Sequence, residues 1–205
     1  MMLYNAQVTD RTFSSIFGLE SQAYAYEVDY STPEYPVLFS KCIFNGDNCL
    51  GGLKIFASKN FIFNKCQFYS GSEKCLSIAC SACVKFINCI FNINRNFDVD
   101  IFAGSNNIMF EECYFKNASE KRLWSCLLGK WSEREVIWRP PVRNVSFVKC
   151  KFDKTLRHGI CVRSKPPNVK MLRFWPALID WSFHIRRLVA SKNKVVGHGV
   201  HETEL

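Results

Sequence analysis

The chain lacks two features of membrane and secreted proteins. It contains no stretch of about 18 consecutive apolar residues, the length that a membrane-spanning helix requires, so we expect no span. It also lacks a basic segment followed by an apolar one at its start, the pattern of a secretory signal peptide. These absences predict a protein that neither spans a membrane nor enters the secretory pathway.

A zinc-finger arrangement is also missing, although cysteine is plentiful at 11 of 205 residues. Cys80 and Cys83 form a Cys-x-x-Cys pair, but no second pair follows at finger spacing. Five of the other cysteines recur at one position of a repeat, where a free cysteine acts as a small hydrophobic residue. We therefore expect reduced thiols, an intracellular protein, and no metal or other cofactor.

The feature that is present is an eight-residue pattern, written five times with small changes. The copies are Val37–Phe44, Phe61–Phe68, Val84–Phe91, Ile108–Phe115 and Val145–Phe152. Their cysteines, Cys42, Cys66, Cys89, Cys113 and Cys150, are separated by 24, 23, 24 and 37 residues. A period in this range indicates stacked structural repeats.

Each repeat contains three short stretches in which apolar residues alternate with others, the period of a β-strand. In the first copy these are Val37-x-Phe39, Cys42-x-Phe44 and Leu53-x-Ile55. A helical repeat would need a 3.6-residue period, and a leucine-rich repeat would need a leucine ladder; neither is present between Val37 and Val162. Three strands in a coil of about 23 residues are the plan of a parallel β-helix, with ladders of like residues inside.

This pattern resembles the right-handed parallel β-helix of the pectate-lyase-like superfamily over roughly residues 37–174. The motifs Cys150-Lys-Phe152 and Gly159-Ile-Cys-Val162 also resemble the adenoviral early β-helix proteins. These are the large early tumour antigen, its capsid-bound atadenoviral relative and the early-region-four adaptor. The resemblance implies a viral protein, either virion-associated or engaging host proteins. The human-type tumour antigen has a long N-terminal extension that this chain lacks, so its functions are not carried over.

We divide the chain into three parts: an N-terminal cap at 1–36, the β-helix at 37–174, and a basic helix and tail at 175–205. The fold class is all-β, a single-stranded right-handed parallel β-helix of about five to six coils. An open end exposes unpaired strand edges, so we expect caps at both ends. Leu178, Trp181, Ile185 and Leu188 recur at helical spacing, which predicts an amphipathic helix.

Two segments are candidates for contact with a protein partner. The fourth and fifth cysteines are 37 residues apart, and the insertion between them carries Trp131 and Trp138. Long insertions in solenoids often lie on a binding face, although this one could instead fold back over the helix. The C-terminal helix, with Trp181, Arg186 and Arg187, is either a cap over the open end or a docking element.

Charge is distributed unevenly along the chain. Residues 1–142 hold 14 basic and 14 acidic groups, whereas residues 143–205 hold 13 basic and 4 acidic groups and so carry the whole net charge of +9. This asymmetry suits a partner with an acidic surface. Nucleic acid is a second possibility, but no nucleic-acid-binding motif accompanies the charge.

Catalysis would require reactive groups on the outward positions of the strands. In the third strands those positions are Lys54, Ser77, Asp100, Trp124 and Cys161. Asp98 and Asp100 point outward from one coil without a second carboxylate from a neighbouring coil, whereas hydrolysis by paired carboxylates needs two acids in opposed roles. We interpret Asp98 and Asp100 as a solvated edge.

The sequence therefore predicts a non-enzymatic binding or scaffold protein that acts through protein–protein contacts, in the host cytoplasm or nucleus or in the virion. The competing class is a protein that binds or cleaves a polysaccharide, because many β-helix proteins do so. The sides of β-helices also associate into trimers, and the sequence leaves the oligomeric state open.

Overall fold

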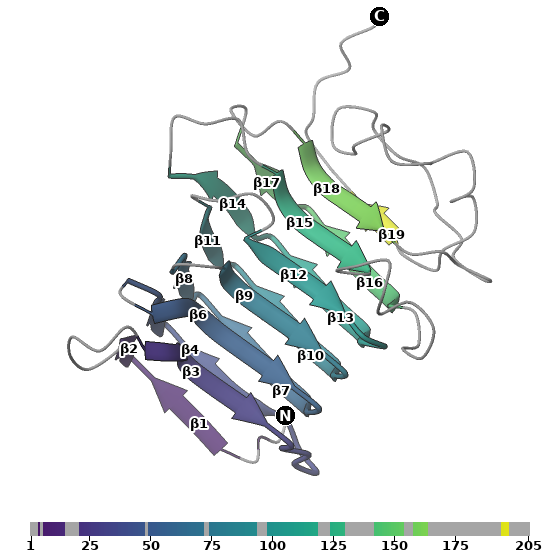
Figure 1. The fold of residues 1–205 in the computed structure, drawn as a ribbon. Coiled ribbons are helices and arrows are strands. Elements are labelled where there is room, and N and C mark those ends of the chain that lie inside the picture. The colour runs from purple at the N-terminus through teal and green to yellow at the C-terminus, as the bar shows by residue number, and fades with distance from the viewer. Residues whose placement is uncertain are drawn as a thin grey trace, which may run out of the picture.

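The computed structural model describes residues 4, 6–14, 21–47, 49–71, 74–93, 98–118, 124–129, 142–153, 158–163 and 194–196. Within these ranges the ordered elements are all strands, and no helix occurs. The strands form three sheets with parallel pairing throughout, stacked as the turns of a β-solenoid (Figure 1). The predicted all-β parallel architecture is confirmed.

Each sheet takes one strand from each turn. Sheet A contains β1 (Ala6–Thr9), β4 (Val37–Ser40), β7 (Lys59–Asn64), β10 (Ala82–Ile87), β13 (Asn106–Glu111), β16 (Arg143–Val148) and β19 (Lys194–Val196). Sheet B contains β2 (Thr12–Ser14), β5 (Ile43–Asn45), β8 (Gln67–Tyr69), β11 (Ile90–Ile93), β14 (Tyr114–Asn117) and β17 (Lys151–Phe152). Sheet C contains β3 (Ser21–Asp29), β6 (Cys49–Phe56), β9 (Lys74–Ala79), β12 (Val99–Phe102), β15 (Trp124–Gly129) and β18 (His158–Arg163).

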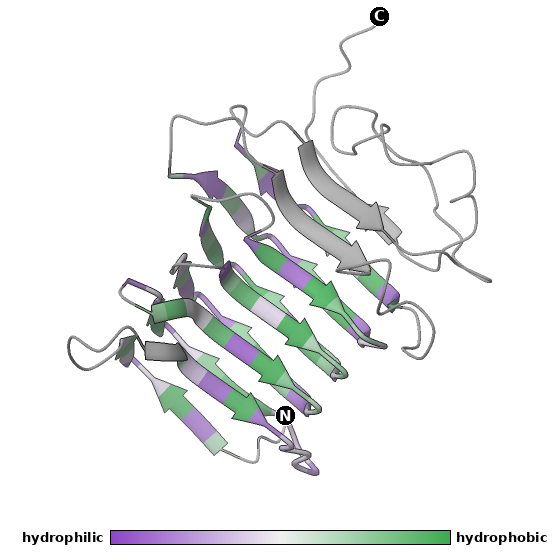
Figure 2. Ribbon diagram, in the orientation of Figure 1, coloured by the Kyte–Doolittle hydropathy of each residue, from purple (hydrophilic) through white to green (hydrophobic). Residues whose placement is uncertain are grey.

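The register places equivalent residues of successive turns directly beside each other. Phe39 pairs with Phe63, which in turn pairs with Phe86, and Leu53 pairs with Leu76. Because side chains alternate between the two faces of a strand, the same residue type points inward in every turn. Bands of opposite hydropathy therefore alternate along the strands (Figure 2).

Phenylalanine rings fill the interior in two columns, as the repeat predicted. Rings within a column are stacked, with centroids 4.7 to 5.0 Å apart and planes within 15° of parallel. The first column is Phe13, Phe44, Phe68, Phe91, Phe115 and Phe152, and the second is Phe39, Phe63, Phe86, Phe110 and Phe147. The columns meet edge to face, an arrangement that suits the quadrupoles of the rings.

The cysteine ladder occupies the corner between sheets A and B. Each thiol donates to a backbone carbonyl one turn earlier. The acceptor is Val8 O for Cys42, at 3.6 Å, and a phenylalanine carbonyl for the other four, such as Phe39 O for Cys66 at 3.5 Å. The residue before each ladder cysteine has a positive φ, such as 55° at Lys65 and 52° at Asn88. A left-handed residue turns the chain sharply, so this corner is set by the backbone as well as by the thiol.

The N-terminal segment, predicted as a cap at 1–36, contributes a further turn. β1, β2 and β3 pair in parallel with β4, β5 and β6 and end the three sheets. Register places Val8 beside Phe39 and Arg11 at the position of Cys42. This turn therefore lacks the Phe/Cys signature by which the others were recognised, which is why the sequence did not reveal it.

The predicted C-terminal helix cap lies outside the described residues. Of the 175–205 segment the structure describes only β19, which pairs in parallel with β16. The sequence pattern did not predict a strand in this segment, so β19 is an element that only the structure shows.

Candidate functional site

The outer face of sheet C was the place where the sequence suggested reactive groups. The structure aligns Glu27 of β3 with Lys54, Lys54 with Ser77, and Ser77 with Asp100. The next partners in this row are Leu127 of β15 and Cys161 of β18. Cys161 was expected in this row, and that prediction is correct. Trp124 was also expected there, but it lies three residues before Leu127 on β15 and pairs with His158. Because extra residues follow the fourth repeat, counting one repeat length onward from Asp100 does not lead to its true partner, Leu127.

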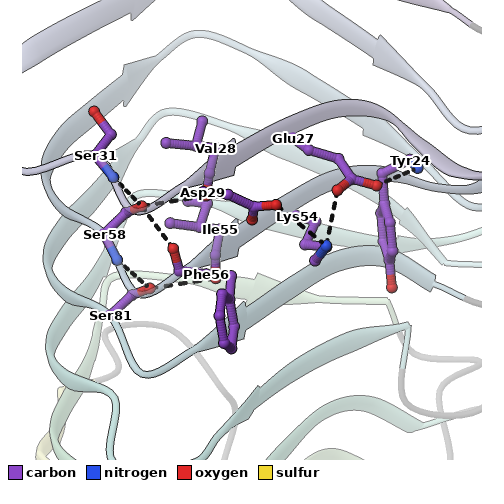
Figure 3. A network of polar contacts seen from close by, with 10 residues as sticks. All are labelled: Tyr24, Glu27, Val28, Asp29, Ser31, Lys54, Ile55, Phe56, Ser58 and Ser81. Carbon is purple, nitrogen blue, oxygen red and sulfur yellow. Dashed lines mark hydrogen bonds and ion pairs between the residues drawn. The ribbon is translucent and has the colours of Figure 1, made fainter.

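Two carboxylates at one end of the row bind a lysine from the next turn. Lys54 Nζ lies 2.8 Å from Glu27 Oε2 and 3.6 Å from Asp29 Oδ2, as Figure 3 shows. Burial tends to raise the pKa of Glu27, but hydrogen bonds from Lys54 and from the Tyr24 N–H outweigh it, so the pKa is lowered. The hydrogen bond to Glu27 raises the pKa of Lys54. Each partner thus favours the charged state of the other.

Asp100, farther along the row, belongs to a buried ion pair. Lys74 Nζ lies 2.8 Å from Asp100 Oδ2, and only 11% and 3% of these two side chains are exposed. Asp98 is fully buried. The expectation that Asp98 and Asp100 form a solvated edge is therefore wrong. Strand alternation predicts the direction of a side chain but not whether other parts of the protein cover it.

A local irregularity accompanies the position of Lys74. The N–H groups of Cys75 and Leu76 both donate to the carbonyl of Asp98, at 2.9 and 3.0 Å. Two consecutive donors on one acceptor are typical of a β-bulge, which shifts the alternation by one residue. Cys75 and Leu76 both belong to the hydrophobic core, while the Lys74 side chain reaches Asp100.

A ladder of serines stands at the corner between sheets C and A, and the sequence analysis did not identify it. The Ser58 hydroxyl oxygen accepts the Ser31 N–H at 2.9 Å, and the Ser81 oxygen accepts the Ser58 N–H at 3.2 Å (Figure 3). Ser105 extends the ladder by accepting the Ser81 N–H at 3.4 Å. The hydroxyls of Ser58 and Ser81 each donate at 2.7 Å to the carbonyl two residues before them. The spacing of Ser58, Ser81 and Ser105 matches the repeat period, so the sequence contained a signal from which this ladder could have been predicted.

Asparagines also hydrogen-bond along the axis of the solenoid. The Asn144 side-chain amide donates to the oxygens of Asn106 and Asn107, at 2.9 and 3.0 Å. Asn60 instead donates to the Pro33 carbonyl at 2.7 Å. These bonds join turns of the solenoid and have a structural role.

Cys80 and Cys83 differ from the other cysteines that the structure describes. Both are exposed, whereas the other seven cysteines whose side chains the structure describes are buried. Register places Cys83 beside Asn60 and Asn107, and all three have a positive φ. Among the described residues no group of three or more His, Cys, Asp or Glu side chains is arranged to hold a metal ion.

The outer face of sheet A carries an aliphatic surface. Its outward residues alternate with the inward phenylalanines and are partly exposed, except for Leu38, which is 9% exposed. We define the sheet A surface as Leu38, Ile62, Ile87, Met109 and Val148. The ion pair between Lys85 and Glu111, at 2.9 Å, lies within it.

The residues predicted to contact a partner cannot be placed. Trp131, Trp138, Trp181, Arg186 and Arg187 lie outside the described residues. Among the described residues, no helix has the length and apolar character needed to cross a membrane.

Three parallel sheets stacked turn upon turn define the class of protein: a parallel β-helix. The family described as right handed beta helix region matches residues 4–126, which is more than half of the chain. The chain therefore belongs to the right-handed β-helix family. No curated protein matches it.

Proposed function

We propose that this β-helix is a non-enzymatic binding or scaffold protein that acts through protein–protein contacts. The observation that carries the proposal is the sheet A surface. It lies on the outer face of five consecutive strands and mixes aliphatic side chains with the Lys85–Glu111 ion pair. Protein interfaces are built from apolar contact area together with polar groups that can pair with a partner.

The carboxylates of sheet C support the same proposal. Glu27 and Asp29 contact Lys54, and Asp100 contacts Lys74 within the fold. Glycoside cleavage needs one carboxylic acid and one carboxylate facing the substrate. Side chains that join neighbouring turns through ion pairs are better suited to stabilising the solenoid.

An intracellular location remains part of the proposal. The nine cysteines whose side chains the structure describes are free thiols, which suits a reducing compartment. The adenoviral resemblance and the contact residues in the insertion and C-terminal helix remain predictions that rest on the sequence.

The test is affinity purification from expressing cells, comparing the wild type with an Ile62→Arg/Met109→Arg variant. Both positions are partly exposed and outward, so the variant should fold. We expect protein partners that co-purify with the wild type and are lost from the variant. The matched control is Gln67→Arg/Tyr114→Arg, on the outer face of sheet B, which should retain them.

A glycan array probed with the same proteins distinguishes this proposal from the alternative, a protein that binds or cleaves a polysaccharide. Binding of a polysaccharide by the wild type, with no protein partner, would overturn the proposal in favour of a carbohydrate-binding protein. Equal loss of partners from both double variants would show that the sheet A surface is not the contact.

A further inference from the structure

We propose that Thr32 is a phosphorylation site for proline-directed protein kinases, the class that modifies a serine or threonine followed by proline. Thr32-Pro33 is the only Ser-Pro or Thr-Pro dipeptide in the 205-residue sequence. It lies in the connection between β3 and β4, at the end of the first turn. This site is separate from the sheet A surface, so the proposal does not depend on a protein contact there.

The connection that carries Thr32 is longer than the equivalent corner of the next turn. Five residues, 32–36, separate Ser31 of the serine ladder (Figure 3) from Val37, which pairs with Phe61. In the next turn only two residues separate Ser58 from Phe61. The first turn therefore has a loop where the next turn has a tight corner. Insertions in solenoids commonly lie on a functional face.

This loop is held to the next turn on both sides of Thr32. The Ser31 carbonyl accepts the Lys59 N–H at 2.9 Å, and the Pro33 carbonyl accepts the Asn60 side-chain amide at 2.7 Å. Thr32 lies between these two anchors and is itself exposed. Its hydroxyl makes no hydrogen bond within the described part of the chain. The fold thus leaves the hydroxyl open to an enzyme while it fixes the residues on either side.

Pro33 also sets the backbone conformation at Thr32. The residue before a proline is kept out of the helical region and adopts an extended conformation. Protein kinases bind the residues around the acceptor hydroxyl in an extended form. Tyr30 and Tyr35, on either side of the dipeptide, are 75% and 44% exposed, so the surrounding segment is also accessible.

The modification transfers the γ-phosphoryl group of ATP to Thr32 Oγ1. The bond from Oγ1 to phosphorus forms while the bond from phosphorus to the bridging oxygen of ATP breaks, ADP leaves, and the catalytic aspartate of the kinase accepts the hydroxyl proton. The product carries about −1.5 to −2 charges at pH 7. Lys59 is exposed one turn away and can offset part of this charge, so the phosphate is compatible with the fold.

The test is incubation of the folded full chain with a purified mitogen-activated protein kinase and Mg-ATP, followed by peptide mass spectrometry. We expect about one phosphate per chain, on Thr32, and none in Thr32→Ala. Pro33→Ala keeps the hydroxyl but removes the dipeptide, so it should slow the reaction about tenfold or more. The matched control is Thr12→Ala, which removes an exposed threonine that no proline follows and should leave the rate unchanged.

Circular dichroism of each variant and of the phosphorylated chain establishes that the strand content is retained. Absence of phosphate at Thr32 in the folded chain would overturn the proposal. So would equal rates for the wild type and Pro33→Ala, because the proline would then play no part in recognition. Modification that appears only after heat denaturation would also overturn it, because the fold would then hide Thr32 instead of presenting it.

Discussion

Lys74 Nζ lies 2.8 Å from Asp100 Oδ2 between the neighbouring strands β9 and β12, with 11% and 3% of the two side chains exposed. A charged pair in this environment is kept only because each charge offsets the burial of the other. The outer face of sheet C, where the sequence suggested solvated carboxylates, therefore contains an ion pair that joins two turns of the solenoid.

Removing one member of this pair should be strongly destabilising. We expect Asp100→Ala to lower the free energy of unfolding by about 3–5 kcal/mol, because Lys74 is left buried without this carboxylate. The double variant Lys74→Met/Asp100→Leu should lose less than Asp100→Ala alone. Urea denaturation followed by circular dichroism measures both.

The control for that experiment is the Lys85–Glu111 pair, whose side chains are 39% and 35% exposed. Glu111→Ala should cost about 0–1 kcal/mol, the range of surface pairs. If Asp100→Ala cost no more than Glu111→Ala, the buried pair would not stabilise the fold.

Phenylalanines inside the column should matter more than those at its end. Phe86 is fully buried and stacks on Phe63 and Phe110, at 5.0 and 4.9 Å. We expect Phe86→Ala to cost about 3–5 kcal/mol through lost burial and an internal cavity. Phe13→Ala, at the half-buried end of the column, should cost clearly less in the same denaturation assay. Equal losses would show that burial of the ring does not set the cost.

Thiol reactivity should separate the cysteines into two classes. Cys80 and Cys83 are exposed, whereas the ladder cysteines are buried, and burial raises the pKa of Cys89 well above its ordinary value. The thiolate is the reactive form, so Cys89 should react slowly, and burial shields the other ladder thiols from the reagent. Iodoacetamide labelling followed by peptide mass spectrometry should modify Cys80 and Cys83 first among the nine cysteines whose side chains the structure describes.

A Cys80→Ser/Cys83→Ser variant is the control for this labelling, and it should leave the described ladder cysteines slow in the folded protein. Rapid modification of Cys66 or Cys89 without denaturant would show that the ladder opens readily. Urea should make all of these thiols reactive.

The Glu27–Lys54 pair should contribute stability that depends on pH in a defined direction. The pKa of Glu27 is lowered on folding, so its contribution is present above the ordinary pKa near 4.5 and is lost as pH falls through the lower folded value. The pKa of Lys54 is raised, so its contribution is present below the ordinary 10.5 and is lost as pH rises through the higher folded value.

Lys54→Met removes the pair and provides the comparison. We expect the wild type to be more stable than this variant at pH 7 by about 0.2–1 kcal/mol, because both side chains are close to one-third exposed. The difference should shrink in acid below the folded pKa of Glu27. A difference that stays constant down to pH 2 would show that lost packing of Lys54, rather than charge, is responsible.

The repeat in the sequence predicted the interior correctly. Phe44 and Phe68 lie directly beside each other because parallel strands in register bring the same repeat position together in each turn. The serine ladder followed the same period, with Ser58, Ser81 and Ser105 at the corner before sheet A, and could have been found in the same way. Arg11 shows the limit of this method, because a turn without the Phe/Cys pattern cannot be found by searching for it.

The sequence alone determined that the chain is a parallel β-helix with phenylalanine and cysteine inside, because strand alternation and a fixed period are local properties that stacking repeats turn after turn. Only the tertiary structure decided the environment of the outward side chains. Asp100 and Lys54 lie in the same outward row of sheet C, yet the Asp100 side chain is 3% exposed, while the Lys54 side chain is 32% exposed. The reason is physical: alternation directs a side chain outward, whereas the parts of the protein that cover it are remote in sequence and leave no mark on the local pattern.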